Sequence, residues 1–427
     1  MKPFFYRMIV AASLLGLTSC SALPAAASGP GYVQSKAARI TQEDVPTSDT
    51  AALVNGNDEF AFNLYQALKG EPGNLFFSPY SITQALAMTY AGASGETQQQ
   101  MAATLHFTLP DNRLNATLNA LDIGLAAMGN NNDEQAAFKL SVVNALWGQS
   151  GYAFQSDFLN VLSQYYGAGM HTLDFAKNQE DARLAINQWV SQQTHQRIQD
   201  LLAKGVITPR TRLVLTNAIY FKASWESQFK TSQTQKGSFF DLSGSAIEVP
   251  MMHQLATFGY ARENGVQVVE LPYNNPDFSM VIMMPDAGTF QSFESSLDAN
   301  KVAGWINDVS DQEIDLTMPR FKFDSSFGLA NTLQGLGMTD AFKPGMADFS
   351  KMGGGKGQLY LQDVIHKAFV AVDEQGTEAA AATGLSVGIS AVPMGNTKVV
   401  IDHPFLFLIR DHQSGTILFI GRVVNPK

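Results

Sequence analysis

Residues 374–394 read Glu-Gln-Gly-Thr-Glu-Ala-Ala-Ala-Ala-Thr-Gly-Leu-Ser-Val-Gly-Ile-Ser-Ala-Val-Pro-Met, and no other segment of the chain is as informative. From Thr377 to Ile389 every second residue is small at first and then branched and apolar, whereas the residues between are polar or small. Such alternation predicts a strand with one buried face. The frequent Gly and Ser and the run of four Ala weaken the strand preference, so the segment could lie outside a sheet or within one.

The small side chains at the start of this segment would let it slide between two strands of an existing sheet. Thr377, Ala379 and Ala381 have little volume and no charge to desolvate, and Gly376 gives the backbone the freedom of a hinge. Burial of the three large apolar residues near the end would contribute about 5–9 kcal/mol, at roughly 1.5–3 kcal/mol each. From this segment alone, an ordinary low-complexity loop or a short edge strand remains the alternative.

The flanking sequence predicts one large α+β domain. Helical periodicity dominates the first half, with a helix opening at Asp58, another over 80–92 and a long one over 181–202. Residues 213–221 form a continuous apolar, β-rich run, which is typical of a strand covered on both faces. The second half predicts strands at 267–271, 278–284, 313–318, 398–401, 405–410 and 416–423.

The composition excludes some partners. Hydrophobic residues make up 45% of the 427-residue chain, charged residues 15%, and the formal net charge is −10. A nucleic-acid footprint needs a basic surface, so no nucleic-acid partner is expected. No Lys/Arg cluster indicates a polyanion cofactor, and no other cofactor is predicted.

The first twenty residues are typical of an export signal. Lys2 and Arg7 precede a short apolar stretch, residues 8–17, which is too short to span a bilayer. Leu17-Thr18-Ser19-Cys20 resembles the lipobox of bacterial lipoproteins, in which the Cys is lipidated. Cys20 is the only cysteine, so no intramolecular disulfide can form. The alternative is a plain signal peptide that ends near Ala25 to Ala27.

These features predict three segments and a location. Residues 1–19 would be a lipoprotein signal peptide, residues 20–52 a flexible tether rich in small residues, and residues 53–427 the folded domain. We expect an exported protein that is lipid-anchored in the cell envelope, at the outer membrane or cell surface, or else secreted.

The chain lacks the motifs of an enzyme. No Gly-x-Ser-x-Gly elbow is present, and the seven His show no metal-binding spacing. The glycine-rich residues 353–357 lack the Ser/Thr that a phosphate loop needs after its Lys. We therefore expect neither catalysis nor a metal site.

The segment around Glu374 resembles the hinge of the serpin family, whose inhibitors carry Glu-x-Gly-Thr-Glu-Ala-Ala-x-Ala. The matching residues are Glu374, Gly376, Thr377, Ala379, Ala380, Ala381 and Ala382. Further family-like motifs lie at 74–86, 213–229, 319–323, 366–376, 403–410 and 421–426. The resemblance spans about residues 57–427 and implies the serpin fold, with large mixed and antiparallel sheets and an exposed reactive-centre loop.

The resemblance implies an irreversible, suicide-substrate inhibitor of serine proteases. In such inhibitors the cleaved bond lies about sixteen residues after the hinge Glu, which indicates Ser390–Ala391 here, with Met394–Gly395 as the runner-up. No Lys or Arg lies between Gly376 and Thr397, which disfavours trypsin-like targets. The side chains suit elastase-, chymotrypsin- or subtilisin-like proteases.

The resemblance also implies a supporting network. Ser78, Ser81, Asn217 and His366 match residues that hydrogen-bond beneath the sheet where it opens, and Trp225 matches a tryptophan at the top of that sheet. The plainer interpretation is that Ser78 caps a helix, His366 lies on the surface and Trp225 packs in the core. Two alternative functions also remain: a non-inhibitory serpin that acts as a cell-surface binding protein, and a cross-class inhibitor of cysteine proteases. We expect a monomer that binds its target protease covalently and the membrane through its lipid.

Overall fold

The computed structural model describes residues 31–129, 138–377 and 397–427. The helices are α1 (Thr47–Leu68), α2 (Pro79–Tyr90), α3 (Gly95–Thr104), α4 (Asp111–Gly129), α5 (Ser156–Tyr166), α6 (Gln179–Gln193), α7 (Phe290–Ser295), α8 (Ala299–Asn307) and α9 (Ala330–Gly335). The strands are β1 (Gly31–Val33), β2 (Leu75–Phe77), β3 (Phe138–Gln149), β4 (Met170–Leu173), β5 (Leu213–Ser224), β6 (Gln235–Phe240), β7 (Ala246–Glu263), β8 (Val266–Pro272), β9 (Phe278–Pro285), β10 (Ser310–Pro319), β11 (Phe321–Gly328), β12 (Leu361–Val372), β13 (Gly376–Thr377), β14 (Thr397–Val400), β15 (Phe405–Asp411) and β16 (Ile417–Val423).

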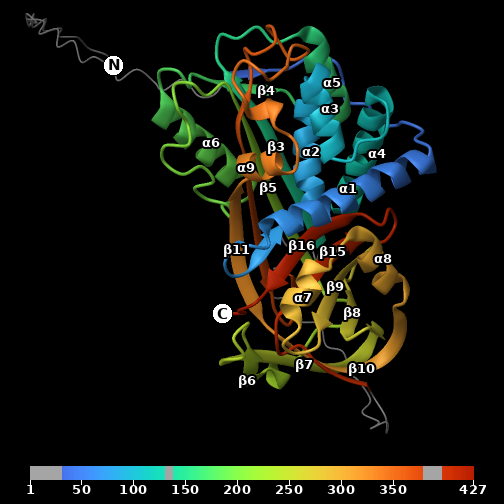
Figure 1. Cartoon of the computed structure of the whole chain (residues 1–427). Coiled ribbons are helices and arrows are strands. Elements are labelled where there is room, and N and C mark those ends of the chain that lie inside the picture. Colours follow the sequence, from blue (N-terminus) through green and yellow to red (C-terminus); the bar gives the residue numbers. More distant parts are fainter. Residues whose placement is uncertain (1–30, 130–137, 378–396) are drawn as a thin grey trace, which may run out of the picture.

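Two sheets and a group of helices make up the molecule. The first sheet has seven strands in the order β1-β4-β3-β5-β13-β12-β11. The second has nine, in the order β14-β10-β7-β8-β9-β15-β16-β2, with β6 paired to β7. Helices α1 to α5 gather at one end of the molecule, and the second sheet lies at the other end with α7 and α8 (Figure 1). The predicted α+β class is confirmed.

The predicted strands are present, but two helices differ from prediction. The first helix begins at Thr47 rather than Asp58, because Leu53 and Val54 pack into the core and Asp49 binds Arg113, Nε to Oδ2, at 2.7 Å. The helix expected to run to residue 202 ends at Gln193. The chain turns there because His195 and Gln196 both adopt positive φ, at 50° and 64°, which is incompatible with a continuing right-handed helix.

Part of the predicted tether is folded onto the domain. We call residues 31–46 the N-terminal strap. Its first residues form β1, which pairs antiparallel with β4. Arg39 then contacts α4, with 2.5 Å to Asp122 and 2.9 Å to Asn119. These backbone and charged contacts offset the entropy cost of ordering a segment that is poor in apolar residues. Within the described part of the chain, the strap is therefore folded and is not part of a flexible tether.

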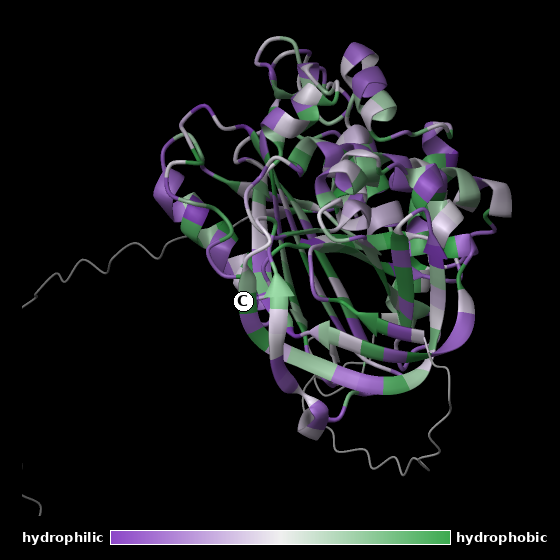
Figure 2. Ribbon diagram, turned by 60° about the horizontal axis from the view of Figure 1, so that its bottom comes forward, coloured by the Kyte–Doolittle hydropathy of each residue, from purple (hydrophilic) through white to green (hydrophobic). Residues whose placement is uncertain are grey.

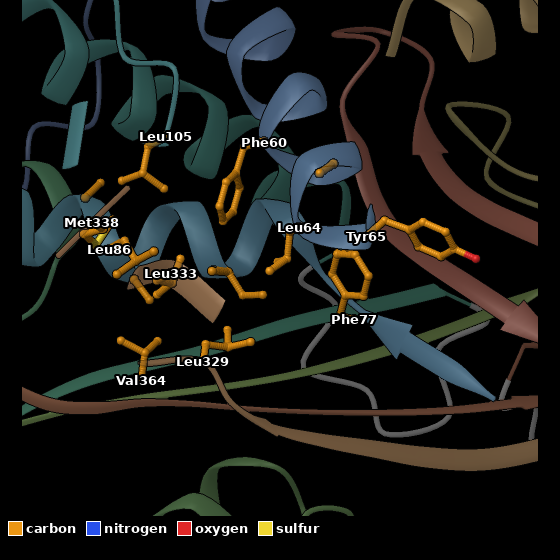
Figure 3. Packing of buried hydrophobic residues seen from close by; sticks show 14 of the residues in the cluster. Phe60, Leu64, Tyr65, Phe77, Leu86, Leu105, Leu329, Leu333, Met338 and Val364 are labelled. Carbon is orange, nitrogen blue, oxygen red and sulfur yellow. The ribbon is translucent and has the colours of Figure 1, made fainter. Parts of the chain in front are cut away.

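The two faces of the first sheet are covered differently. Alternate residues of β5 point to opposite faces: Leu213 and Leu215 pack with α1 and α2, whereas Val214 and Ala218 pack under α6. Many strands carry alternating green and purple bands in Figure 2, as expected where one strand face meets the core. Figure 3 shows the layer on the first face, where α1 and the wholly buried α2 lie over the sheet.

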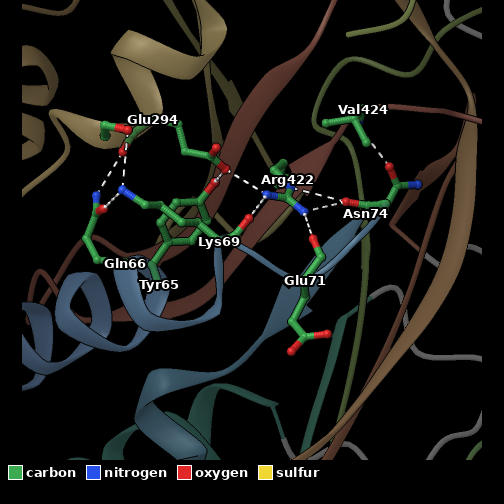
Figure 4. A network of polar contacts seen from close by, with 10 residues as sticks. Tyr65, Gln66, Lys69, Glu71, Asn74, Glu294, Arg422 and Val424 are labelled. Atoms are coloured by element: carbon green, nitrogen blue, oxygen red, sulfur yellow. Dashed lines mark hydrogen bonds and ion pairs between the residues drawn. The ribbon is translucent and has the colours of Figure 1, made fainter. Parts of the chain in front are cut away.

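A buried arginine fixes the end of the chain. Arg422, 4% exposed, donates to the backbone carbonyls of Lys69, Glu71 and Gly73 and to the Glu294 carboxylate at 2.8 Å (Figure 4). These bonds join β16 to the turn after α1. Because a buried charge without partners would be costly, this arrangement is strongly specified.

Candidate functional site

The site is the boundary between β5 and β12, which we call the seam. These central strands pair in parallel from Leu213 and Leu361 to Ile219 and Ala368. Beyond that point the strands separate, and the two residues of β13 lie between them. We call this wider end of the seam its mouth. The sequence predicted β5 as a strand, but it did not predict β12 and gave no sign that the hinge would contact both strands.

The two hinge residues within β13 fit the mouth closely. Thr377 pairs with Ala223 on one side and Val372 on the other, and it is 1% exposed. At Gly376 an added Cβ would collide with the Ala223 carbonyl oxygen and lie 2.7 Å from Ser224 Cα. Only glycine therefore allows the chain to pass this close to β5.

Tyr273 holds Thr377 in place, and sequence reasoning missed it. The two hydroxyl groups lie 2.7 Å apart, both buried, and burial raises the pKa of Tyr273 far above its ordinary value. The Tyr273 ring stacks on Trp225 with 4.8 Å between centroids and 5° between planes. A lone Tyr after a predicted strand carries no signal of this role.

Trp225 is also bound to the turn that leads into the hinge. Its indole Nε1–H donates to the Asp373 carbonyl at 2.9 Å, and its backbone N–H donates to the Gln375 carbonyl at 2.9 Å. Both bonds require the turn and β5 to stay in register. Trp225 therefore lies at the mouth of the seam, packed against the hinge as well as the core.

Glu374 anchors the same turn. Its side chain is buried, accepts a hydrogen bond from Thr234 at 2.6 Å and lies 3.5 Å from Arg320 Nε. Its backbone carbonyl accepts from Phe229 N–H at 2.9 Å. The buried carboxylate accepts a hydrogen bond from a hydroxyl and lies beside a guanidinium, so Glu374 fixes where the hinge begins.

A polar row crosses the middle of the seam. In the strand register, Asn144 of β3 lies opposite Asn217 of β5, and Asn217 lies opposite His366 of β12. The Asn217 amide N–H₂ donates to Asn144 Oδ1 and to Ser81, whose carbonyl oxygen is 2.8 Å away. The bond between Asn217 and His366 joins the two strands across the seam.

His366 is neutral, and its tautomer follows from its partners. The Ser78 backbone N–H donates to Nε2 at 3.2 Å, so Nε2 carries no proton and Nδ1–H donates to Asn217 Oδ1. The ring is fully buried, and that burial lowers the pKa of His366 to about 3. Neither of the hydrogen-bond partners described for the ring, Ser78 and Asn217, is an anion, so protonation opposes the pairing of β5 with β12.

Helix α2 supports the row from below. Ser78 caps the helix, because its side-chain oxygen accepts a hydrogen bond from the Ser81 N–H at 3.1 Å. Pro79 has no backbone N–H, but at the first helical position an N–H would have no partner within the helix. The helix N-terminus thereby presents Ser78 N–H and Ser81 oxygens to the two strands. Capping and network membership, which the sequence offered as alternatives for Ser78, are both true of the structure.

The structure thus brings Ser78, Ser81, Asn217 and His366 together and places Trp225 with Glu374, Gly376 and Thr377 at the mouth. Asn144 also belongs to the first group. The only indication of this role in the sequence is that Asn144 is a polar residue within an apolar run. Several predicted residues lie outside the described residues: Cys20, Ala379, Ala380, Ala381, Ala382, Ser390, Ala391, Met394 and Gly395. In the described parts, no helix has the length and apolar character needed to cross a membrane.

Comparison with known proteins agrees with this geometry. The family model described as Serpin (serine protease inhibitor) matches residues 55–426. An uncharacterized serpin-like protein of Thermococcus kodakarensis is 39% identical over 378 residues, which is 88% of this chain and 86% of that protein. The leukocyte elastase inhibitor of Sus scrofa is 38% identical over 386 residues, 88% of this chain and 99% of that protein.

A solved structure shows the same architecture. The thermophilic serpin tengpin, in its native state, superposes with a TM-score of 0.82 at 28% identity. The match covers 93% of this chain and 100% of that chain. The serpin fold expected from the sequence is therefore confirmed.

Proposed function

The chain belongs to the serpin family, and from this membership we propose that it is an irreversible inhibitor of serine proteases. A target protease cleaves the loop that follows the hinge. The freed loop then enters the seam as an additional strand and carries the attached protease with it.

The arrangement of β13 is the observation that supports this proposal most. Thr377 lies opposite Ala223 in antiparallel register, so each further residue of an inserted loop moves one position back along β5. Continued in this way, the loop brings Thr383 opposite Asn217 and Val387 opposite Leu213. The hinge is thus already in the register that a fully inserted strand would need.

The two faces of the inserted strand would match their surroundings. The Thr377 set of alternate residues would share the face of Leu213 and Leu215, which is covered by α1 and α2. Leu385 and Val387 would then complete that apolar layer. Thr383 would bring a hydroxyl into the row of Asn217 and His366, whose mutual bond insertion breaks, and so supply a replacement hydrogen bond.

The covalent step uses the protease's own chemistry. The protease serine oxygen adds to the Ser390 carbonyl carbon and the 390–391 peptide bond breaks. The Ala391 amine leaves with the serine proton, and Ser390 stays attached to the enzyme as an ester. Insertion before water reaches this ester would distort the enzyme and trap it.

The target class follows from the loop residues. Ser390 and Ala391, like the runner-up pair Met394 and Gly395, suit the small or apolar pockets of elastase-, chymotrypsin- or subtilisin-like proteases. We also propose that residues 1–19 are removed, that Cys20 is lipidated and that the domain acts as a monomer outside the cytoplasm.

One experiment tests the trap. The purified protein is incubated with an elastase, a chymotrypsin and a subtilisin, and SDS-stable complexes are sought on gels while mass spectrometry locates the cleaved bond. Thr377→Arg should form no complex and should be cleaved as a substrate, because a guanidinium cannot be buried beside Tyr273. Thr377→Ser, which keeps the hydroxyl, is the matched control. Equal inhibition by Thr377→Arg and the unmodified protein would exclude loop insertion, and a binding protein would then be the better proposal.

A further inference from the structure

The two ends of the seam lie at opposite poles of the molecule, and the chain enters the domain at only one of them. Leu213, at the closed end of the seam, is opposite Gly148 of β3, and Gly148 is opposite Thr172 of β4. Thr172 is in turn opposite Gly31 of β1. A single row of paired residues therefore joins the closed end of the seam to the first described residue.

The mouth, with the hinge, is at the other pole. Ala223 and Leu213 are ten residues apart on β5, which corresponds to about 33 Å at 3.3 Å per residue. In Figure 1, β4 lies near the top with α5, whereas β7 and β10, next to β14, lie at the bottom. The strap fixes this placement, since β1 is paired to β4 and Arg39 is bound to α4.

Insertion runs from the mouth toward the pole of Gly31. In the register set by Thr377, Ser390 would lie three residues beyond Leu213, so the ester-linked protease would emerge at this pole. The inserted strand would be four strand spacings from β1, or about 19 Å. The trapped protease and the N-terminal segment would therefore leave the domain side by side.

Only a short stretch separates that pole from the lipid. Cys20 is eleven residues before Gly31, and eleven residues span at most about 36–40 Å. A protease of about 220 residues has a radius of gyration of about 17 Å, so it is roughly 40–45 Å across. The gap between the domain and the membrane is thus no larger than the enzyme that would be delivered into it.

We propose that in the lipid-anchored protein the loop first meets its target on the side away from the membrane, and that insertion then presses the captured protease against the lipid surface beside the anchor. This inference rests on the proposed function and on lipidation of Cys20. The partner in this proposal is a bilayer surface, which would limit the positions and orientations that the trapped protease can adopt.

The test compares the protease before and after insertion. The full lipidated chain is placed in vesicles of phosphatidylethanolamine and phosphatidylglycerol that contain an acceptor-labelled lipid, and the protease carries a donor fluorophore. The active enzyme should give several-fold stronger energy transfer to the lipid than the same enzyme with its catalytic serine changed to alanine, which docks without cleaving. Equal transfer in the two arms, with SDS-stable complex present, would overturn the inference and leave the inhibitor proposal intact.

The other outcomes are also decisive. Absence of an SDS-stable complex would overturn the inhibitor proposal, and mass spectrometry that finds no lipid on Cys20 would overturn the membrane inference alone. Deletion of residues 22–27 leaves a reach of about 17–18 Å. In vesicles, cleavage that does not trap the protease should be several-fold more frequent for this variant than for the full-length chain. In detergent, the two proteins should not differ. A variant with these residues replaced by Gly and Ser at equal length is the control, and equal behaviour of the two variants would contradict the proposal.

Discussion

The seam in the first sheet and the strands β9, β15 and β16 in the second are both central and buried, yet they are built differently. The strands β9, β15 and β16 pair antiparallel and are buried along almost their whole length, and Phe76 of the neighbouring β2 stacks on Phe407 and Phe419. The seam is parallel, a pairing that is slightly weaker per residue. Its middle is held by Asn217 and His366 rather than by apolar packing.

Under the proposed function, the second sheet must stay closed and the seam must open. Apolar interdigitation has no replacement partner once it is pulled apart, so the second sheet resists separation. In the proposed mechanism, hydrogen bonds across the seam are exchanged for bonds to the inserted strand, and Gly376 and Thr377 already pair at the mouth. The polar row thus keeps the sheet closed without making its opening prohibitive.

The largest effect is expected at Gly421, in the rigid sheet. A Cβ at this position would overlap the ring of Phe407, which is itself fully buried. Gly421→Ala should therefore lower the free energy of unfolding by about 3 kcal/mol, the upper range for overpacking. Urea unfolding followed by circular dichroism measures this loss. Gly304→Ala, where the added carbon meets open space within helix α8, should cause no loss and should stabilise by up to about 1 kcal/mol. Absence of a loss at Gly421 as well would show that the second sheet yields to the added carbon.

The next effect is expected at the polar row. Asn217→Ala leaves the buried Nδ1–H of His366 without its acceptor and should cost about 2 kcal/mol. It should also speed spontaneous insertion of the uncleaved loop, seen as loss of inhibitory activity during storage. A double-mutant cycle with His366→Ala checks the pairing, because additive losses would mean that the two side chains do not interact across the seam.

The seam should weaken in acid. Above pH 6.5 the His366 ring is neutral in both the folded and the unfolded chain, so its contribution to stability is fully present. As the pH falls from 6.5 toward about 3, the unfolded chain binds a proton that the folded protein does not. Stability should therefore fall by up to about 1.4 kcal/mol per pH unit. Urea midpoints at several pH values measure this, and His366→Gln should show a shallower slope; parallel curves would rule out His366 as the cause.

The smallest effect is expected at the strap, far from the seam. Arg39 and Asp122 are each about three-tenths exposed, so Arg39→Ala should cost about 0.5–1 kcal/mol. Thermal unfolding measures the change, and Arg39→Lys, which keeps the charge, should recover part of it. A loss as large as that at Gly421 would mean that the strap belongs to the core after all.

Prediction from sequence succeeded where an apolar run is long and continuous, and failed where pairing is non-local. The runs at 213–221 and 278–284 are apolar on both faces and were recognised as strands. β1 has only Gly31, Tyr32 and Val33, and its pairing to residues 170–172 cannot be read from either segment alone. The polar row was located only through family resemblance, because Asn217 and His366 are 149 positions apart and neither shows its partner locally.

The face-to-face contact of Trp225 and Tyr273 also makes the mouth visible to spectroscopy. The chain has four tryptophans. Trp225 is the one that stacks on Tyr273 and donates a hydrogen bond to the turn at Asp373. Trp147→Phe, Trp189→Phe and Trp305→Phe would leave Trp225 as the one tryptophan, and its emission would report the arrival of the proposed inserted strand in real time without any added label.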